Sequence, residues 1–410
     1  MESGSVPGLA TDLQSPDWTG RLAARTRGRD GTLSAILATA NAEGIINFSG
    51  GFPEHALFPT DALHPLVEKL LHDDASIALQ YAPTEGIAST RAQLRDQLEE
   101  RQGCRPAESE LMVTSGGIDA ITLIAKSMLD TGDTVLVEEP SYVGAVTGFT
   151  SFDGTVLGIP IDSDGLDVDA VARLLEGPVQ PKLLYVIPEH QNPTGWTLSA
   201  DRRPALVELC RRHGVLIVED VAYRELNFGS DPAPSLWSLA PDVVVQIGTF
   251  SKTFFPGVRL GWAAGPAPII AQMVFAKQNS DQCAGALGQR LLEEFVRAGY
   301  YDEHVARARA LYQRRAAAME AALSEQFAGT PATWSHPNGG FFCWLRLPGV
   351  DTTALASRAR KDNVAFVPGA GFFAGAADSE HLRLSYSRVS EPDIGEGIAR
   401  LASAAGYSRP

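Results

Sequence analysis

One lysine in this chain has neighbours that suit covalent chemistry at its amine. Lys252 follows a β-branched apolar run at residues 243–247 and lies in a loop between two expected strands. Bulky apolar residues flank it, namely Phe250, Phe254, Phe255 and Pro256. Most lysines are solvated surface side chains, but an apolar environment disfavours the ammonium form and lowers its pKa. A neutral amine at ordinary pH is what Schiff-base formation requires, so the loop predicts a reactive amine.

A second stretch has the form of an anion-binding turn. Residues 111–114 are expected to form a short strand that ends in Ser115-Gly116-Gly117, and apolar residues at helical spacing follow from Ile118 to Met128. A glycine turn at a helix N-terminus presents free backbone N–H groups and the positive end of the helix dipole, which can hold a phosphate. Glycines at such turns often serve backbone geometry alone. The motif by itself is therefore compatible with a phosphate site and with a purely structural turn.

These stretches belong to a long alternation of strands and helices. Apolar strands are expected at 111–114, 134–138, 155–161, 182–187, 215–219, 243–247 and 259–264, with helices at 118–128, 142–150, 168–175 and 199–213. This pattern is typical of an α/β fold whose mostly parallel sheet is covered on both faces. Ligands bind beyond the carboxyl ends of strands in such sheets. Ser115–Gly117, Asn192, Asp220 and Ser251–Lys252 lie at those ends, and we expect them to form one site.

The patterns change after residue 267, where long helices dominate. A helix is expected at 301–326, and strands at 339–347 and 381–386 indicate a second, smaller α/β unit. We expect a large domain at 49–300, a small domain at 301–410, and an arm at 1–48 that partly joins the small domain. The arm includes a weak helical pattern at 32–42. Its arginines, Arg21, Arg25, Arg27 and Arg29, are interpreted as a solvated face.

Composition excludes several classes of protein. The 410 residues carry 34 Lys and Arg against 49 Asp and Glu, a net charge of −15 that disfavours binding to nucleic acid or anionic membranes. No apolar run approaches the roughly 18 residues of a membrane span, and the first twenty residues lack a signal-peptide pattern. The four cysteines are far apart and have no metal-ligand spacing. We expect a soluble, cytoplasmic protein without a metal site.

The ordered set of motifs resembles the fold-type I pyridoxal-phosphate enzymes. Within them it is similar to the class I/II aminotransferases of the 2-aminoadipate and kynurenine aminotransferase group. The resemblance extends from about Asn47 to Arg388, and each motif alone is less specific than the set. The motifs are Gln80-Tyr-Ala-Pro-Thr-Glu-Gly86, Gln191-Asn-Pro-Thr-Gly195, Glu219-Asp-Val-Ala-Tyr-Arg224, Ser251-Lys252 with Arg259, and Arg383.

The resemblance implies that pyridoxal 5'-phosphate is the cofactor and suggests which residues bind its ring. Lys252 bonds covalently to the cofactor aldehyde and becomes the general base at the α-carbon once a substrate amine displaces it. Asp220 pairs with the pyridine nitrogen and keeps it protonated, so that the ring can accept electrons. Tyr223 and Asn192 hydrogen-bond the phenolic oxygen, and Tyr142 stacks on the ring.

The same resemblance implies contacts to the phosphate and to the substrate. The phosphate site comprises Ser115, Gly116, Gly117, the amide of Ile118, Ser251 and Arg259. Tyr81 reaches the phosphate of a neighbouring subunit, which requires a homodimer with shared active sites. Arg383 binds the substrate α-carboxylate bidentately, with Asn192 and the backbone of Gly51 nearby. Relatives commonly carry a hydroxyl and an amide residue in place of Gly117 and Ile118, so phosphate binding here relies on backbone amides.

The implied reaction is transamination between an α-amino acid and a 2-oxo acid in two half-reactions. His55 and His190 lie next to site motifs and are interpreted as structural histidines, although either could supply an extra acid or base. In that case the alternative is a specialised pyridoxal-phosphate enzyme that decarboxylates, eliminates or oxidises its substrate. A transcription regulator that carries this domain is the rival from another class. The short segment before Asn47 and the acidic charge argue against it.

Overall fold

The computed structural model of the chain describes residues 17–23, 25, 44–229 and 231–407. The described residues before Asp30 belong to one compact unit, in which a 3-10 turn spans Thr19–Arg21, and the described residues from 44 onward belong to a second. The helical pattern at 32–42 and the arginines Arg27 and Arg29 lie outside the described residues. In the described part of the chain, no helix combines the length and apolarity needed to cross a membrane.

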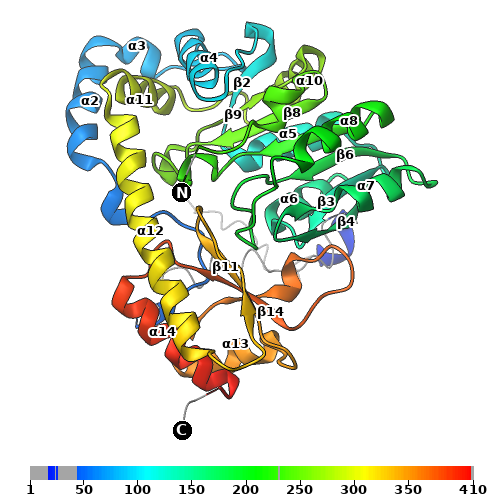
Figure 1. The fold of residues 1–410 in the computed structure, drawn as a ribbon. Coiled ribbons are helices and arrows are strands. Elements are labelled where there is room, and N and C mark those ends of the chain that lie inside the picture. The colour runs from blue at the N-terminus through cyan, green and yellow to red at the C-terminus, as the bar shows by residue number, and fades with distance from the viewer. Residues whose placement is uncertain (1–16, 24, 26–43, 230, 408–410) are drawn as a thin grey trace, which may run out of the picture. The chain divides into compact units, whose positions relative to one another are not determined.

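The larger unit contains an eight-stranded sheet (Figure 1). Its strands are β2 (Leu111–Thr114), β3 (Thr134–Glu139), β4 (Thr155–Asp162), β5 (Gly165–Leu166), β6 (Pro181–Val186), β7 (Leu216–Asp220), β8 (Val244–Thr249) and β9 (Gly261–Ala264). Their order is β2-β9-β8-β7-β6-β3-β4-β5. The central pairs from β8 to β4 are parallel, which confirms the predicted α/β class.

The edges of this sheet are antiparallel. Strand β9 runs antiparallel to both β8 and β2, and β5 runs antiparallel to β4. Only residues 250–260 connect β8 to β9, and a parallel connection needs a crossover of a dozen or more residues, usually a helix. The chain therefore turns back directly, and Lys252 lies in that turn.

Helices cover both faces of the large sheet. The helices of this region are α2 (Thr60–Asp73), α3 (Ala75–Ala78), α4 (Ala88–Gln102), α5 (Gly117–Met128), α6 (Val143–Thr150), α7 (Val168–Leu175), α8 (Arg202–His213), α9 (Leu236–Leu239), α10 (Ala267–Gln278) and α11 (Ala286–Arg297). On β6, Leu183 and Tyr185 pack in one core with α5, α6 and α10. Leu184 and Val186 pack in the other core with α4, α7 and α8. Both faces are buried, which explains why the strands read as continuous apolar runs.

A second sheet lies in the C-terminal part of the chain. It is antiparallel, with the order β10-β11-β14-β13, and a separate parallel pair joins β1 to β12. The strands are β1 (Ile46–Asn47), β10 (Thr333–Trp334), β11 (Phe342–Arg346), β12 (Val364–Ala365), β13 (Val367–Pro368) and β14 (His381–Ser385), and the helices are α12 (Tyr300–Gln326), α13 (Thr352–Lys361) and α14 (Glu391–Ala405). The long helix α12 packs against α11 and α14 (Figure 1). The domain boundaries expected at residues 48 and 300 remain predictions.

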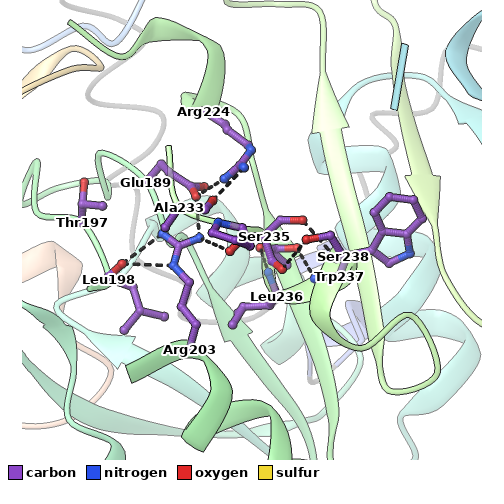
Figure 2. A network of polar contacts seen from close by, with 12 residues as sticks. Glu189, Thr197, Leu198, Arg203, Arg224, Ala233, Ser235, Leu236, Trp237 and Ser238 are labelled. Atoms are coloured by element: carbon purple, nitrogen blue, oxygen red, sulfur yellow. Dashed lines mark hydrogen bonds and ion pairs between the residues drawn. The ribbon is translucent and has the colours of Figure 1, made fainter. Parts of the chain in front are cut away.

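A buried network of ion pairs fixes the loops that follow β6 and β7 (Figure 2). The Glu189 carboxylate accepts hydrogen bonds from Arg203, at 2.8 Å, and from Arg224. Arg203 also donates to the backbone oxygens of Leu198 and Pro234, and Arg224 to that of Ala233. Glu189 precedes the loop that contains Asn192, and Arg224 follows the Asp220–Tyr223 segment, so the network ties two parts of the predicted site to the scaffold.

We expect Arg203→Met to lower the free energy of unfolding by about 3–5 kcal/mol, because removal of one partner leaves the buried Glu189 carboxylate undercompensated. Urea titration followed by intrinsic fluorescence measures the change. Arg211→Met, on the same helix, is the control, since the Arg211–Asp242 pair lies at the surface, where water screens it, and its loss should change the free energy of unfolding far less. Equal losses in the two variants would contradict a structural role for the network.

Candidate active site

A cavity of about 260 Å³ lies beyond the ends of β7 and β8 and beside the N-terminus of α5. All of the predicted site residues line it except Ser115, Gly116 and Tyr81. The predicted residues that line it are Gly51, Gly117, Ile118, Tyr142, Asn192, Asp220, Tyr223, Ser251, Lys252, Arg259 and Arg383. Residues as far apart in the sequence as Gly51 and Arg383 therefore line the same cavity.

The amine of Lys252 is buried in this cavity. Its Nζ donates a hydrogen bond to the backbone oxygen of Gly51 at 2.7 Å. Burial, reinforced by the charge of Arg383, lowers the pKa of Lys252 to about 8, while Asp220 opposes the shift. A Cβ at position 51 would lie 2.7 Å from the ring of Phe342, so only glycine allows the Phe342 ring to pack this close to the backbone that binds Lys252. The neutral amine is therefore more populated near neutral pH than that of an ordinary lysine, in the direction that the apolar flanks predicted.

Asp220 ends β7 and is also buried. Its Oδ1 accepts a hydrogen bond from the backbone N–H of Ala222 at 3.1 Å, and its Oδ2 accepts one from the hydroxyl of Tyr185 at 2.8 Å. Burial raises the pKa of Asp220 to about 6, and the two hydrogen bonds limit that rise. The carboxylate retains lone pairs for a further donor in the cavity.

Arg259 approaches the turn before α5. Its Nη2 donates to the backbone oxygen of Ser115 at 3.0 Å, and its Nη1 donates to the hydroxyl of Ser251 at 3.3 Å. Gly116 has a φ of 101°, and a Cβ there would lie 2.6 Å from Nη2. Glycine at 116 is therefore needed both for the backbone conformation and for the guanidinium. The result is a cation and a hydroxyl beside the unpaired N–H groups of a helix N-terminus.

The side chains of two residues predicted to contact the phosphate do not line the cavity of this chain, namely Ser115 and Tyr81. The Ser115 hydroxyl bonds Asp281 and accepts a hydrogen bond from Lys277 at 3.1 Å, so it takes part in a separate ion-pair cluster. The backbone of Ser115 nevertheless holds Arg259. Tyr81 is 77% exposed and does not line the cavity of its own chain. Its predicted contact is to a second subunit and remains a prediction.

Arg383 projects from β14 between two aromatic rings. Its guanidinium carbon lies 4.3 Å from the ring centre of Phe342 and 5.0 Å from that of Phe372. It donates to Asn192 Oδ1 at 2.8 Å and to the backbone oxygen of Ser49 at 2.5 Å. Burial lowers the pKa of Arg383 to about 10, so the group stays charged at neutral pH.

Two tyrosines complete the walls of the cavity. The ring of Tyr223 packs edge-on against Phe341 and Phe342, with ring centres 5.5 and 5.7 Å away. Tyr142 precedes α6 and is half-buried. Burial raises the pKa of Tyr142 to about 12, and the pKa of Tyr223 shifts upward for the same reason. Both hydroxyls are therefore protonated donors at neutral pH.

Neither histidine that the sequence singled out lines the cavity. His55 is exposed, and its Nδ1 lies 2.9 Å from the Glu54 carboxylate. His190 is buried, has a φ of 51°, and packs so closely on Gly339 that a Cβ there would lie 2.2 Å from its Nε2. Burial lowers the pKa of His190 to about 4, so the imidazole is neutral. The placement favours the structural interpretation of both residues.

Sequence reasoning missed three side chains of the site. Phe342 and Phe372 line the cavity beside Arg383, and Tyr185 binds Asp220 from the neighbouring strand. Phe342 and Tyr185 lie inside strands that were expected, but their apolar patterns gave no sign of a site. Phe372 lies in a turn that Glu139 anchors, since Glu139 Oε1 accepts from the N–H groups of Ala374 and Gly375 at 3.1 and 2.8 Å. That anchor joins residues more than 200 positions apart.

The groups in the cavity fit pyridoxal phosphate. Arg259, the Ser251 hydroxyl and the N-terminus of α5 suit a phosphate dianion, and the glycine at 116 leaves room for the guanidinium. The Asp220 carboxylate suits a protonated ring nitrogen, and the amine of Lys252 suits an aldehyde. These groups line one cavity, with Tyr142 as an aromatic wall.

Comparisons with known proteins show the family of this chain. Residues 43–401 match the family described as aminotransferase class I and II. A 2-aminoadipate transaminase from Thermus thermophilus is 37% identical over 91% of this chain and 93% of its own length. An aromatic-amino-acid aminotransferase from Thermococcus litoralis is 34% identical over 90% of this chain and 89% of its own.

A solved structure extends the similarity to the fold. The α-aminoadipate aminotransferase of Thermus thermophilus, complexed with N-(5'-phosphopyridoxyl)-L-leucine, superposes with a TM-score of 0.88 at 35% identity. The match covers 95% of this chain and 98% of the other. The chain therefore belongs to the class I and II aminotransferase family, and it is a pyridoxal phosphate-dependent aminotransferase.

Proposed function

We propose that this cavity moves an amino group between an α-amino acid and a 2-oxo acid, with Lys252 as the catalytic base. The observation that carries the proposal is the buried amine of Lys252, whose pKa is lowered to about 8, in a cavity that also contains Asp220 and Arg383. A carboxylate for the cofactor and a guanidinium for the substrate thus flank one amine that can take up a proton. The substrates proposed are small amino acids and 2-oxo acids, not nucleic acids or membranes.

Arg383 binds and orients the substrate. Its planar guanidinium matches a carboxylate bidentately, and Phe342 and Phe372 hold it from two sides. Asn192 Oδ1 accepts a hydrogen bond from Arg383 Nη1, and this bond fixes the orientation of the guanidinium. A substrate whose α-carboxylate binds there has its α-carbon oriented toward the cavity that contains Lys252.

Lys252 moves the proton. The bound cofactor supplies an electron sink for the electrons released at the α-carbon. Lys252 Nζ takes the α-proton, holds it, and delivers it on the same side of the cavity, which requires a base within hydrogen-bond reach. Asp220, as a carboxylate, would hold the ring nitrogen of the cofactor, and Tyr223 and Asn192 would hold its phenolic oxygen. The aromatic residues Tyr142, Phe342 and Phe372 reduce the access of water.

Binding of the phosphate is assigned to backbone and cation together. Gly116, Gly117 and the amide of Ile118 begin α5, and Ser251 and Arg259 approach the same turn. The Ser115 hydroxyl is engaged by Lys277, and its backbone N–H donates to Asp119, so we assign to Ser115 the role of holding Arg259 through its backbone oxygen. This arrangement fits a chain that has Gly117 and Ile118 where relatives carry polar side chains.

The fate of the substrate follows from which groups are near it. Diversion to decarboxylation, elimination or oxidation would use an additional acid or base, for which His55 and His190 are the candidates. Neither lines the cavity, so we retain transamination as the reaction. A cytoplasmic location and the division into domains at 49–300 and 301–410 remain proposals that the sequence supports.

We further propose a homodimer in which Tyr81 of each subunit completes the phosphate site of the other. The supporting observation is that Tyr81 is a large aromatic residue with 77% of its surface exposed. It is the second residue of the Gln80–Gly86 motif. An exposed tyrosine combines apolar area with a hydroxyl donor, which suits a subunit interface.

We expect Lys252→Ala to lower the transamination rate by about 10²- to 10⁴-fold, because the base that accepts the α-proton is lost. Absorbance spectra of the protein with added pyridoxal phosphate should also lose the band of the covalently bound cofactor. Lys69→Ala, which removes a surface amine, is the control and should retain both properties. Persistence of the band in Lys252→Ala would rule out the proposed role.

We expect Arg383→Lys to raise the KM for amino-acid substrates by about 10²-fold, since an ammonium cannot form the bidentate pair. Steady-state kinetics across an amino-acid panel measures this, and equilibrium titration should show unchanged cofactor affinity. Arg346→Lys, in the adjacent strand β11 and paired with Glu380 at the surface, is the matched control. A KM that does not change would assign the α-carboxylate to another group.

We expect Tyr81→Phe to weaken pyridoxal-phosphate binding by about tenfold, because a hydrogen bond to a charged phosphate is lost. Sedimentation velocity should show a two-chain particle for both wild type and variant. Mixing Tyr81→Phe with Lys252→Ala chains should restore wild-type affinity in one site of each mixed dimer, since that site receives Lys252 from one chain and Tyr81 from the other. A monomeric particle, or no restoration, contradicts the shared site.

A further inference from the structure

Tyr185 and Asp220 form a hydrogen-bonded pair behind the cavity. Tyr185 lies in β6 opposite Val218 in β7, and Asp220 is two residues beyond Val218 on the same face of the sheet. The tyrosine hydroxyl thus reaches diagonally to Asp220 Oδ2 at 2.8 Å. Tyr185 does not line the cavity, whereas Asp220 does. The pair therefore connects the core of the sheet to the site.

The surroundings hold this tyrosine in one position and one protonation state. Its side chain is fully buried, and its ring packs edge-on against Phe149 with ring centres 5.8 Å apart. Burial, together with the neighbouring Asp220 charge, raises the pKa of Tyr185 well above its ordinary value. The hydroxyl is thus a permanent donor at working pH, and the carboxylate is its acceptor.

We propose that Tyr185 is a positioning residue that keeps Asp220 ionised and directs its remaining lone pairs toward the ring nitrogen of the cofactor. The proposal rests on the role proposed above for Asp220. A carboxylate that received only the Ala222 amide could rotate about its Cβ–Cγ bond. With Tyr185 on Oδ2 and Ala222 on Oδ1, both oxygens are held.

The charged and titratable groups around Asp220 show how the Tyr185 hydrogen bond affects its ionisation. Glu138 of β3 faces it from the sheet, and burial raises the pKa of Glu138 to about 8, so that carboxyl is largely uncharged at neutral pH. Lys252, Tyr142 and Tyr223 face it from the cavity side. Lys252 favours the carboxylate, whereas burial opposes it. The Tyr185 hydroxyl is the largest of the favourable influences on the ionised form.

Removal of the Tyr185 hydroxyl should therefore change the pKa of Asp220 in one direction. A donor to a carboxylate stabilises the charged form, so its loss raises the pKa of Asp220 further above 6. Asp220 then takes up a proton at a higher pH and binds the protonated ring nitrogen less well. A tyrosine that served packing alone would leave this titration unchanged, because phenylalanine preserves the ring.

The test is Tyr185→Phe, compared with Tyr386→Phe. Tyr386 is also fully buried, and its hydroxyl donates to the backbone oxygen of Gly339 at 2.8 Å, so the control removes an equivalent buried hydroxyl elsewhere. We expect Tyr185→Phe to raise the Kd for pyridoxal phosphate by about tenfold and to lower kcat by about 10- to 100-fold with little change in KM. Tyr386→Phe should change none of these parameters beyond about twofold.

Two readouts separate positioning from packing. The pH at which cofactor affinity falls on acidification should lie near 6 in the wild type and Tyr386→Phe, and should move upward by about one unit in Tyr185→Phe. NMR of ¹⁵N-labelled pyridoxal phosphate bound to the enzyme should show a protonated ring nitrogen in the wild type and a partly deprotonated one in Tyr185→Phe at the same pH. An unchanged titration and ring-nitrogen shift in Tyr185→Phe would overturn the proposal.

Asp220→Asn distinguishes failure of this inference from failure of the function proposed for Asp220. If Asp220→Asn weakens cofactor binding and deprotonates the ring nitrogen while Tyr185→Phe does neither, only the role of Tyr185 is wrong. If Asp220→Asn also leaves both unchanged, the pairing of Asp220 with the ring is wrong and the inference fails with it. Thermal unfolding of each variant checks that all four proteins are folded.

Discussion

Burial of charge is the constraint on which this structure depends. The cavity removes an amine, a carboxylate and a guanidinium from water, and desolvation shifts each toward its neutral form. The pKa of Lys252 falls to about 8, that of Asp220 rises to about 6, and that of Arg383 falls to about 10. One physical cause therefore gives a lysine that can lose its proton, while Asp220 stays largely ionised and Arg383 stays charged at neutral pH.

The protein offsets that cost with fixed partners rather than with solvent. Asp220 is held by two donors, Arg383 by two acceptors, and Lys252 by one carbonyl. A second layer of buried ion pairs, such as Glu54 with Arg315 at 2.7 Å, connects the segments that supply those partners to the scaffold. Buried pairs of this kind contribute little net stability. Here they hold the loops around the cavity in defined positions.

Local apolar patterns were enough to predict the large sheet apart from the two-residue strand β5, whereas most of the site residues were predicted from the resemblance to a known family. The strands from β2 to β9 and the helices between them follow apolar periodicity, because both faces of the sheet are buried. Lys252, Asp220 and Arg259 lie in ordered motifs, and the cavity gathers them. The antiparallel direction of β9 was less visible, since it depends on a short connection rather than on the strand itself.

Contacts between distant parts of the chain could not be predicted. The Ser115 hydroxyl lies next to the predicted phosphate turn, but Lys277 and Asp281, more than 160 residues away, engage it. Tyr185 has the appearance of an ordinary strand residue until its neighbour in the sheet is known. Side-chain pairing across strands is set by register, and register is a property of the assembled sheet.

The side chains that line the cavity come from both sheets. Asp220, Lys252 and Arg259 follow strands of the eight-stranded sheet or lie between them, whereas Phe342 and Arg383 belong to the four-stranded one, and Phe372 lies in a turn that precedes its strand β14. Glu139, which accepts two backbone amides from that turn, needs the absence of a side chain at Gly158, where a Cβ would lie 2.4 Å from its carboxyl carbon. Glu139 and Gly158 both belong to the eight-stranded sheet, so this sheet also sets the position of the turn that carries Phe372. A side chain at position 158, outside the cavity, is therefore expected to displace that wall of the cavity.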